Sequence, residues 1–282
     1  MDDRLDVSEV CDELERIYEA GSYPALRVTR PWSTYNPTIS GEVARPRALR
    51  GYLERELGQL HRLGAVLSVE VSRPRLALDD PLLLHGADES NWDLKQKKLF
   101  LFSAERMELS FERLAHYTGT DPAEFQRHVL LTNYAMHVEA FLERFPDAAV
   151  ARPGAQMPAY HATEADGGGV SLVNIGVGPS NAKTLTDHVA VLRPDLLLMI
   201  GHCGGLRNHQ DIGDFVLART FLRADRVLDD ALARHVPVIS NHHVNQALYA
   251  ALDRRGLPYR FGAVYTTADR NWELHLASAM AD

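Results

Sequence analysis

Residues 170–200 have the sequence VSLVNIGVGPSNAKTLTDHVAVLRPDLLLMI, in which two apolar runs flank an amphipathic segment. The runs at 170–175 and 195–200 are nearly continuous, which is typical of strands buried on both faces of a parallel sheet. The segment 179–192 has apolar residues at helical spacing, and Pro194 follows its end. This strand–helix–strand pattern predicts a βαβ unit and therefore an α/β fold.

The rest of the second half continues the pattern, with a strand near 215–218, a helix near 241–255 and a strand near 261–265. The first half predicts a mixture of elements around a loop at 31–46. Its expected helices are 7–20, 48–63, 104–117 and one from Asp121 onward, and its expected strands are 25–29 and 66–71.

The expected domain boundary lies in a stretch rich in Pro, Gly, Ala and Asp, residues 146–169, which has no clear periodicity. We therefore expect an α+β domain over residues 1–145 and an α/β domain over residues 155–282. A length of 282 residues leaves room for two such domains.

The composition is that of a soluble globular protein, with 45% hydrophobic and 24% charged residues. The net charge of −8 disfavours nucleic acid as the main partner. The longest apolar stretch, 196–200, is too short to span a bilayer. The acidic N-terminus lacks the pattern of a signal peptide, and the chain has only two cysteines, so we expect a cytoplasmic protein with reduced thiols.

A glycine-rich turn follows the first strand of the βαβ unit. Gly176 and Gly178 allow a tight backbone turn, and the helix after it, beginning near Pro179, would present free N–H groups to an anion. Ser180 adds a hydroxyl there. The turn has neither the third glycine of the dinucleotide fingerprint nor the Gly-Lys-Ser/Thr of a P-loop. It predicts a phosphate or ribose pocket, with a tight turn that binds nothing as the alternative.

A second glycine-rich turn, Gly201-His-Cys-Gly-Gly205, follows the next strand. Both turns thus lie at strand carboxyl ends, the edge at which open α/β sheets bind ligands. His202 and Cys203 are adjacent and lack partners at ligand spacing, so no metal site is expected. No pattern supports a nucleophilic cysteine. The turn is interpreted as small residues packed under a ligand.

Several longer segments resemble the AMP nucleosidase family of the nucleoside phosphorylase superfamily. In the second half these are residues 170–218, from VSLVNIGVGPS to DFVLA, and YTTADRNWEL at 265–274. In the first half they are YPALRVTRPWSTYNP at 23–37 and HYTGTDPAEFQRHVLLTNY at 116–134. The resemblance implies a nucleoside phosphorylase-like α/β/α catalytic domain preceded by an α+β regulatory domain. It also implies hydrolysis of AMP to adenine and ribose 5-phosphate, a step in AMP salvage.

The resemblance further implies which residues surround the nucleotide. Arg207 and Arg270 are candidates for phosphate contact, with a surface or interdomain salt bridge as the alternative. Trp272 is a candidate for stacking on adenine, although a lone tryptophan is as often part of a core. The other candidates are Gly176, Gly178, Ser180, Asn181, Gly201, Cys203, Gly204 and Gly205 in the two turns, and Thr266, Thr267 and Asp269 near the base.

The chain departs from the family's pattern at its end. It stops at Asp282, before the family's Asp-Met-Glu-Ser segment and the later Ser-Asp segment. We therefore expect an incomplete catalytic domain, assign no catalytic residue, and keep open that this chain is inactive alone. The alternatives are a nucleotide-binding or regulatory relative without turnover and a purine nucleoside phosphorylase. A dinucleotide-dependent oxidoreductase is disfavoured by the missing fingerprint.

The resemblance also implies a homo-oligomer, with a hexamer as the expected form, and no tightly bound cofactor. Mg-ATP is implied as an allosteric activator and phosphate as an inhibitor, both at the N-terminal domain. Arg47, Arg50 and Arg55 on the expected second helix could contact such an anion, or they could form a solvated face.

Overall fold

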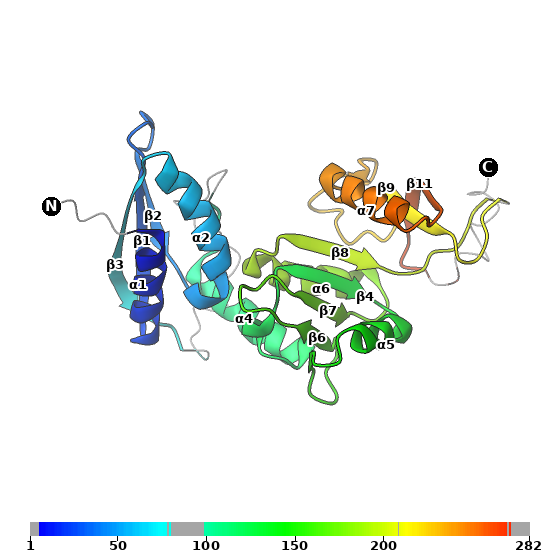
Figure 1. Ribbon diagram of the computed structural model, residues 1–282, viewed down its shortest axis with the longest axis horizontal. Helices are drawn as coiled ribbons and strands as arrows, with labels where there is room; N and C mark the ends of the chain where they lie inside the picture. The colour runs from blue at the N-terminus through cyan, green and yellow to red at the C-terminus, as the bar shows by residue number, and fades with distance from the viewer. Residues whose placement is uncertain (1–5, 78, 80–98, 208, 270, 272–282) are drawn as a thin grey trace. The chain divides into compact units, whose positions relative to one another are not determined.

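The computed structural model describes residues 6–77, 79, 99–207, 209–269 and 271 (Figure 1). The chain forms two compact units. Unit 1 comprises residues 1–176 and 184–200, and unit 2 comprises residues 177–183 and 201–282. These units cut across the two domains expected from the sequence, whose boundary stays a prediction.

Unit 1 begins with an antiparallel sheet of order β2-β1-β3 and two helices. Helix α1 lies against β1 and β3 and packs on α2 (Figure 1). The bounds are α1 Val7–Glu19, β1 Ser22–Thr29, β2 Thr38–Glu42, α2 Pro46–Arg62 and β3 Val66–Pro74. The two expected helices and two expected strands of this region are confirmed, whereas β2 lies in the stretch that was expected to be a loop.

Helix α1 shows how the sequence fixes its own boundaries. The Asp6 side chain accepts a hydrogen bond from the Glu9 backbone, and the Glu9 side chain accepts one from the Asp6 backbone, which forms a capping box. Val10, Leu14 and the Cys11 thiol are buried on one face. Burial raises the pKa of the Cys11 thiol to about 12, so this cysteine is an inert core residue.

The expected helix from Asp121 onward is wrong over its first half. A short 3-10 turn, η2 (Pro122–Glu124), is followed by strand β4 (His128–Thr132), and the helix α5 begins only at Ala135 and ends at Arg144. The preceding helix α4 (Ala104–Thr118) is confirmed. The helical spacing seen in the sequence belongs to α5 alone.

Strand β4 lies inside a five-stranded sheet of order β5-β6-β7-β4-β8. The other strands are β5 Ala149–Val150, β6 Ala159–Ala162, β7 Val170–Asn174 and β8 Leu196–Ile200. β4 pairs in parallel with both β7 and β8. Helix α6 (Pro179–Val189) and the 3-10 turn η3 (Ala190–Leu192) connect β7 to β8, which confirms the βαβ unit.

Strand β8 differs from the expected fully buried strand. It is an edge strand of the sheet, and Leu197 and Met199 are 42% and 49% exposed. β7, which lies inside the sheet, has a buried centre as expected.

The described part of unit 2 contains a three-stranded sheet of order β10-β9-β11 and the helix α7. β9 (Phe215–Arg223) pairs in parallel with β11 (Tyr259–Thr266) and antiparallel with β10 (Val238–Ile239). Helix α7 (His242–Arg254) is capped by Asn241, whose side chain accepts from two backbone N–H groups. Tyr249 of α7 stacks on Tyr259 of β11 with ring centroids 5.4 Å apart.

No helix in the described part of the chain has the length and hydropathy of a membrane span.

Candidate active site

Three parallel strands of unit 1 end at one edge of its sheet. Thr132 at the end of β4 pairs with Asn174 of β7 on one side and with Ile200 of β8 on the other. Both glycine-rich turns follow these strand ends directly. The carboxyl edge of a parallel sheet is the usual place for a ligand in an α/β fold, so this edge is the candidate active site.

The turn after β7 is built from hydrogen bonds and left-handed glycines. The Ile175 N–H donates to the Thr132 carbonyl at 2.8 Å, and the Gly176 N–H donates to the Asn174 side-chain oxygen at 3.1 Å. Gly176 and Gly178 have φ angles of 66° and 118°, which glycine adopts without strain. The predicted residues Ser180 and Asn181 lie in the first turn of α6, directly after it.

Asn133 is a candidate residue that the sequence analysis missed. It follows β4 at the same edge, and its side-chain oxygen is buried without a hydrogen-bond partner among the described residues. Its neighbour Thr132 is fully engaged, because its hydroxyl contacts His137 Nδ1 at 2.6 Å and accepts from the Tyr134 N–H at 3.2 Å. A ligand N–H or O–H group would satisfy the Asn133 oxygen. The run of apolar and β-branched residues at 128–132 was the available signal for a strand ending here.

The turn after β8 is exposed from Gly201 to Gly205, and Cys203 is a free, exposed thiol. Arg207 is exposed, and its backbone N–H donates to the Gln210 side chain at 2.9 Å. Within the described ranges, no group of three or more His, Cys, Asp or Glu residues is arranged to hold a metal ion.

Three more predicted residues, Thr266, Thr267 and Asp269, lie at or just after the carboxyl end of β11 in the unit 2 sheet. The Thr266 hydroxyl donates to Asp225 Oδ2 at 2.7 Å. The Asp269 N–H donates to the Thr267 hydroxyl at 3.1 Å, and Asp269 itself is exposed. Arg270 and Trp272, the other two predicted residues, lie outside the described residues.

Two further polar residues lie at this edge and were not predicted. Arg223 pairs across the sheet with Thr266, is 7% exposed, and donates through Nη2 to the carbonyls of Leu232 and Ala233 at 2.7 and 2.9 Å. Asp225 accepts from Thr266 and from the Val227 N–H. Both residues therefore organise the loop after β9, and Asp225 fixes the direction of the Thr266 hydroxyl.

The structure brings the predicted residues together in three groups: the turn after β7, the turn after β8, and the end of β11. Gly176 belongs to unit 1, and the other described members belong to unit 2.

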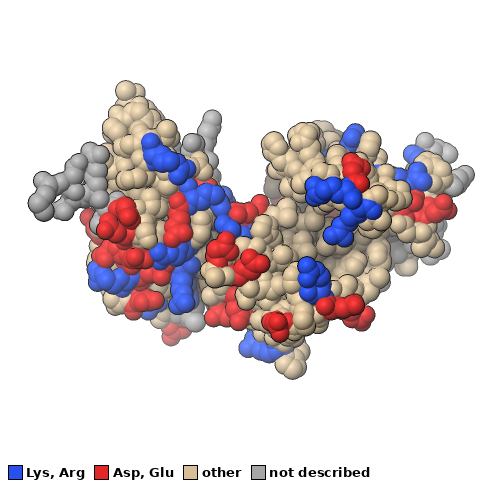
Figure 2. All heavy atoms as spheres, viewed as in Figure 1, with Lys and Arg blue, Asp and Glu red and all other residues tan. Residues whose placement is uncertain are grey.

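Two of the three arginines expected as effector contacts on α2 bind carboxylates of the chain itself. Arg50 contacts Asp12, Glu15 and Glu54 at 2.8 to 2.9 Å, and Arg55 contacts Asp195 at 2.7 Å. Hydrogen bonds to these acids raise the pKa of Arg50 above its usual value, and the bond to Asp12 has the largest effect. Figure 2 shows such acidic and basic side chains interleaved over α1 and α2. Arg47 is exposed.

The sequence and the fold are both similar to those of known proteins. A family model described as the phosphorylase superfamily matches residues 127–281, starting just before β4. AMP nucleosidase of Escherichia coli (strain K12) is 37% identical over 351 aligned positions, which cover 96% of this chain and 72% of that protein. Uridine phosphorylase of Thermococcus kodakarensis is 23% identical over 58% of this chain and 59% of that protein.

Solved structures of the superfamily share the fold. AMP nucleosidase from Bacteroides thetaiotaomicron superposes with a TM-score of 0.54 and 30% identity, covering 60% of this chain and 70% of that chain. A uridine phosphorylase from Vibrio fischeri superposes with a TM-score of 0.50 at 13% identity, covering 55% of this chain and 66% of that chain, which shows the fold alone.

The alignment with the E. coli relative is longer than this chain, 351 positions against 282 residues, so that relative has segments with no counterpart here. The matched residues nevertheless include β4, β7 and β8 and both glycine-rich turns at their ends. The parallel sheet, the candidate ligand edge and these matches agree, and the chain belongs to the AMP nucleosidase family of the phosphorylase superfamily.

Proposed function

We propose that this chain hydrolyses the N-glycosidic bond of AMP, giving adenine and ribose 5-phosphate. The observation that carries the proposal is its 37% identity to an AMP nucleosidase over 96% of its length. The strand-edge geometry supports it, because both glycine-rich turns follow strands that end at one edge of the sheet.

Cleavage of this bond develops positive charge on the ribose and negative charge on the departing purine. A site therefore needs contacts for the 5′-phosphate, a positioned water and a hydrogen bond or proton for the base. In our proposal the turn Gly176–Ser180 and the N-terminus of α6 receive the phosphate, with Arg207 and Arg270 as further contacts. Asn133 accepts a hydrogen bond from the nucleotide. Thr266, Thr267, Asp269 and Trp272 are assigned to the base, and the group that protonates the purine is left unassigned.

A nucleotide-binding relative without turnover is the second candidate. The observation in its favour is the set of aligned positions in the E. coli enzyme that have no counterpart here. A purine nucleoside phosphorylase is less well supported, because the phosphorylase match is weaker in identity and in coverage than the match to AMP nucleosidase.

The test is adenine release from AMP by the purified 282-residue chain, followed by liquid chromatography with and without added inorganic phosphate. A hydrolase releases adenine and the reducing sugar ribose 5-phosphate without added phosphate. A phosphorylase requires phosphate and yields a non-reducing sugar 1-phosphate. Equilibrium AMP binding on the same sample separates a non-catalytic relative from a protein that does not recognise AMP.

Two glycine variants provide a matched control for this assay. Gly178→Trp places a large side chain on the turn, at a φ of 118°. Gly154→Trp has the same kind of left-handed backbone and the same open space around its Cβ, but it lies in the loop before β6. Adenine release that is lost in the first variant and retained in the second supports the proposal. Neither binding nor release, in a sample shown to be folded, contradicts it.

We also propose that residues 1–145 form a regulatory domain of a cytoplasmic homo-oligomer, with Mg-ATP as activator and phosphate as inhibitor. The support is the resemblance of residues 23–37 and 116–134 to the family. Initial rates at several Mg-ATP and phosphate concentrations test the response, and light scattering during size-exclusion chromatography tests the oligomer.

A further inference from the structure

The buried side chains of helix α6 lie in its C-terminal half. They are Leu185 and Val189, and no residue from Pro179 to Thr184 is buried. The N-terminal half carries Ser180 and follows the glycine-rich turn directly. Because an 11-residue helix is a stiff rod about 16 Å long, the position of its N-terminus depends on what holds its other end.

Two side chains of α4 contact that other end. Arg106 donates through Nη2 to the Asp187 carbonyl at 2.8 Å, and the Ser110 hydroxyl lies 3.2 Å from His188 Nδ1. Asp187 and His188 are in the last turn of α6, where backbone carbonyls lose their partners within the helix. A cation at this end also complements the helix dipole. Arg106 therefore caps the C-terminus of α6.

Arg106 and Ser110 lie on one face of α4. They are four residues apart, which places them one helical turn from each other. Ser110 is fully buried, and the Arg106 guanidinium lies 5.7 Å from the centroid of the Phe102 ring. Both side chains are thus held in place by their own surroundings as well as by α6.

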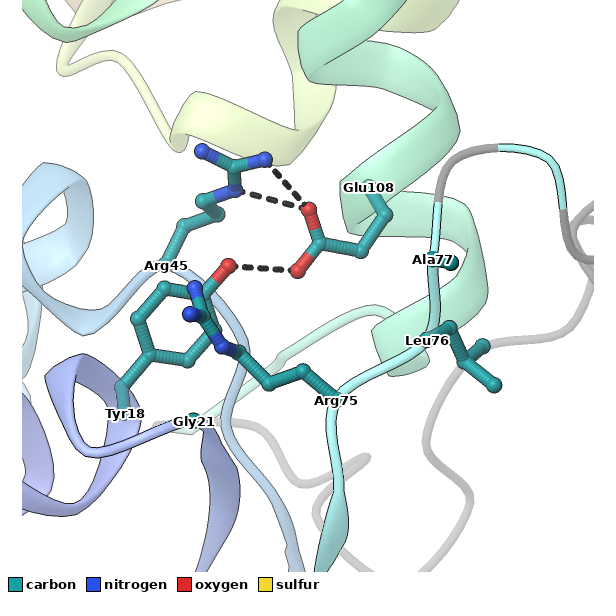
Figure 3. A pocket seen from close by; sticks show the side chains of 7 residues that line it. All are labelled: Tyr18, Gly21, Arg45, Arg75, Leu76, Ala77 and Glu108. Atoms are coloured by element: carbon teal, nitrogen blue, oxygen red, sulfur yellow. Dashed lines mark hydrogen bonds and ion pairs between the residues drawn. The ribbon is translucent and has the colours of Figure 1, made fainter.

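The opposite face of α4 is fixed to α1 and to the residue before α2. Glu108 lies two positions from both Arg106 and Ser110, and is therefore on the other side of the helix. Glu108 is 3% exposed, and its carboxylate accepts from the Tyr18 hydroxyl at 2.5 Å and from Arg45 Nε at 2.7 Å (Figure 3). A shift of α4 against α1 would leave this buried carboxylate unpaired, which is costly. α4 is therefore a firm support for α6.

The segment that follows α6 is held by the same part of the chain. The Arg193 guanidinium lies 5.0 Å from the centroid of the Tyr52 ring and 5.2 Å from that of the Phe100 ring. The Tyr52 hydroxyl donates to the Phe100 carbonyl at 3.1 Å, which joins the two aromatic residues. The C-terminal end of α6 is thus fixed both in place and in direction.

This support lies outside the segment shared with the phosphorylases. The superfamily match begins at residue 127, whereas α4 ends at Thr118. The first part of this chain therefore supplies the residues that hold α6 at its C-terminus.

We propose that Arg106 is a positioning residue for the 5′-phosphate of AMP. By capping α6, it sets where the helix N-terminus and the turn Gly176–Ser180 receive the phosphate, and it does not touch the nucleotide itself. The inference rests on the proposed function. The phosphate is remote from the glycosidic bond and is bound alike in the ground state and the transition state, so a displaced α6 weakens binding and leaves the chemical step unchanged.

Steady-state kinetics of adenine release from AMP test this role. We expect Arg106→Leu to raise KM at least fivefold while kcat stays within twofold of the parent. Arg106→Lys keeps a cationic donor for the single Asp187 carbonyl and should return KM to within twofold. Arg113→Leu is the matched control, since Arg113 is an exposed arginine on the same helix.

Product inhibition separates a displaced phosphate end from a general loosening of the site. In Arg106→Leu the inhibition constant of ribose 5-phosphate should rise in parallel with KM. The inhibition constant of adenine, which has no phosphate, should stay within twofold. An equal rise for both products, a KM rise of the same size in Arg113→Leu, or a lower melting temperature with unchanged KM would overturn the proposal.

Hydrogen exchange of the α6 amides tests the same inference without activity. The Ala182 N–H donates to the Gly178 carbonyl at 3.4 Å, which joins α6 to the glycine-rich turn. We expect Arg106→Leu to speed exchange at Ala182 at least fivefold and Arg113→Leu to leave it unchanged. A parent that releases no adenine would contradict the proposed function, and this measurement would still decide the role of Arg106. Faster exchange confined to residues 187–189 would make Arg106 a local cap only and overturn the proposal.

Discussion

Asn133 is the residue whose environment most clearly indicates ligand contact. A buried, unpaired acceptor costs free energy, and a ligand donor would recover it. We expect Asn133→Ala to lower kcat/KM for AMP at least tenfold while leaving the melting temperature unchanged or higher. Asn245→Ala is the control, because its amide already donates to Ala218 O and Ser240 Oγ. That variant should lose stability and keep its activity per folded molecule. The reverse result for Asn133, lower stability with normal activity, would make it a structural amide.

His161 predicts a pH dependence of stability. It is fully buried between the hydroxyls of Ser171 and Thr120, and desolvation lowers its pKa from 6.5 to about 4. Because the folded pKa lies below the unfolded one, this stabilisation is complete above pH 6.5 and is lost as the pH falls towards 4. The loss is about 3 kcal/mol.

Urea unfolding between pH 7 and pH 4 measures this loss. In His161→Gln the decrease in unfolding free energy over this range should be smaller by most of that amount. His235→Gln, at an exposed position, should retain the parent slope. An unchanged slope in His161→Gln would mean that His161 is not the group that titrates.

At the scale of single residues, the sequence predicts features that depend on the residue type alone. It misses features that depend on contacts with residues far away in the chain. Gly176 and Gly178 indicate a turn because glycine adopts left-handed backbone angles without help from other residues. Asn133 cannot be distinguished from other asparagines until its buried oxygen is seen to lack a partner. Arg47 and Arg50 lie one helical turn apart on α2 and are equivalent in sequence, yet Arg47 is exposed whereas Arg50 contacts three carboxylates.

At the scale of elements, helices with a full amphipathic face are predicted nearly to the residue, as α1 and α4 show. Short strands are missed unless, like β7 and β8, they form nearly continuous apolar runs. β4 and β6 have five and four residues, too few to establish a period, and the neighbouring α5 extends its helical pattern over β4. This error hid the strand end that carries Asn133.

Gly169 fixes the close approach of β6 to β7. A Cβ placed there would lie 2.0 Å from the Ala162 carbonyl oxygen, which is backbone and cannot rotate away. We expect Gly169→Ala to lower the unfolding free energy by about 2 to 3 kcal/mol through local displacement of the strands. Gly51→Ala is the control, since Gly51 lies within α2 and the nearest neighbour of its added Cβ would be Arg127 Cδ, an ordinary contact at 3.7 Å. That variant should be neutral or stabilise the protein by up to about 1 kcal/mol. Urea denaturation followed by circular dichroism measures the unfolding free energy of both variants. Equal stability of the two variants would contradict the steric argument.

At the scale of the whole molecule, the first 126 residues and the phosphorylase-like segment share contacts within unit 1. Val191 of η3 is fully buried in the core cluster built from α1, α2 and β1. Asp195, at the start of β8, contacts Arg55 of α2 at 2.7 Å and Arg127 at 3.7 Å. The sequence could not show this coupling, because it pairs residues far apart in the chain. It places α1, α2 and the candidate active-site edge in one packed body.

This coupling predicts that one core substitution weakens both halves of unit 1. Val191→Ala removes buried methyl groups at the junction and should cost about 2 kcal/mol. Native-state hydrogen exchange should show the loss equally in α2 and in β7, because both then open in the same cooperative event. Val264→Ala is the control. It lies on β11 of unit 2 and should leave the protection of α2 and β7 unchanged. If Val191→Ala lowers protection in α2 alone, the two halves unfold independently, and the shared core around Val191 does not couple α2 to the candidate active-site edge.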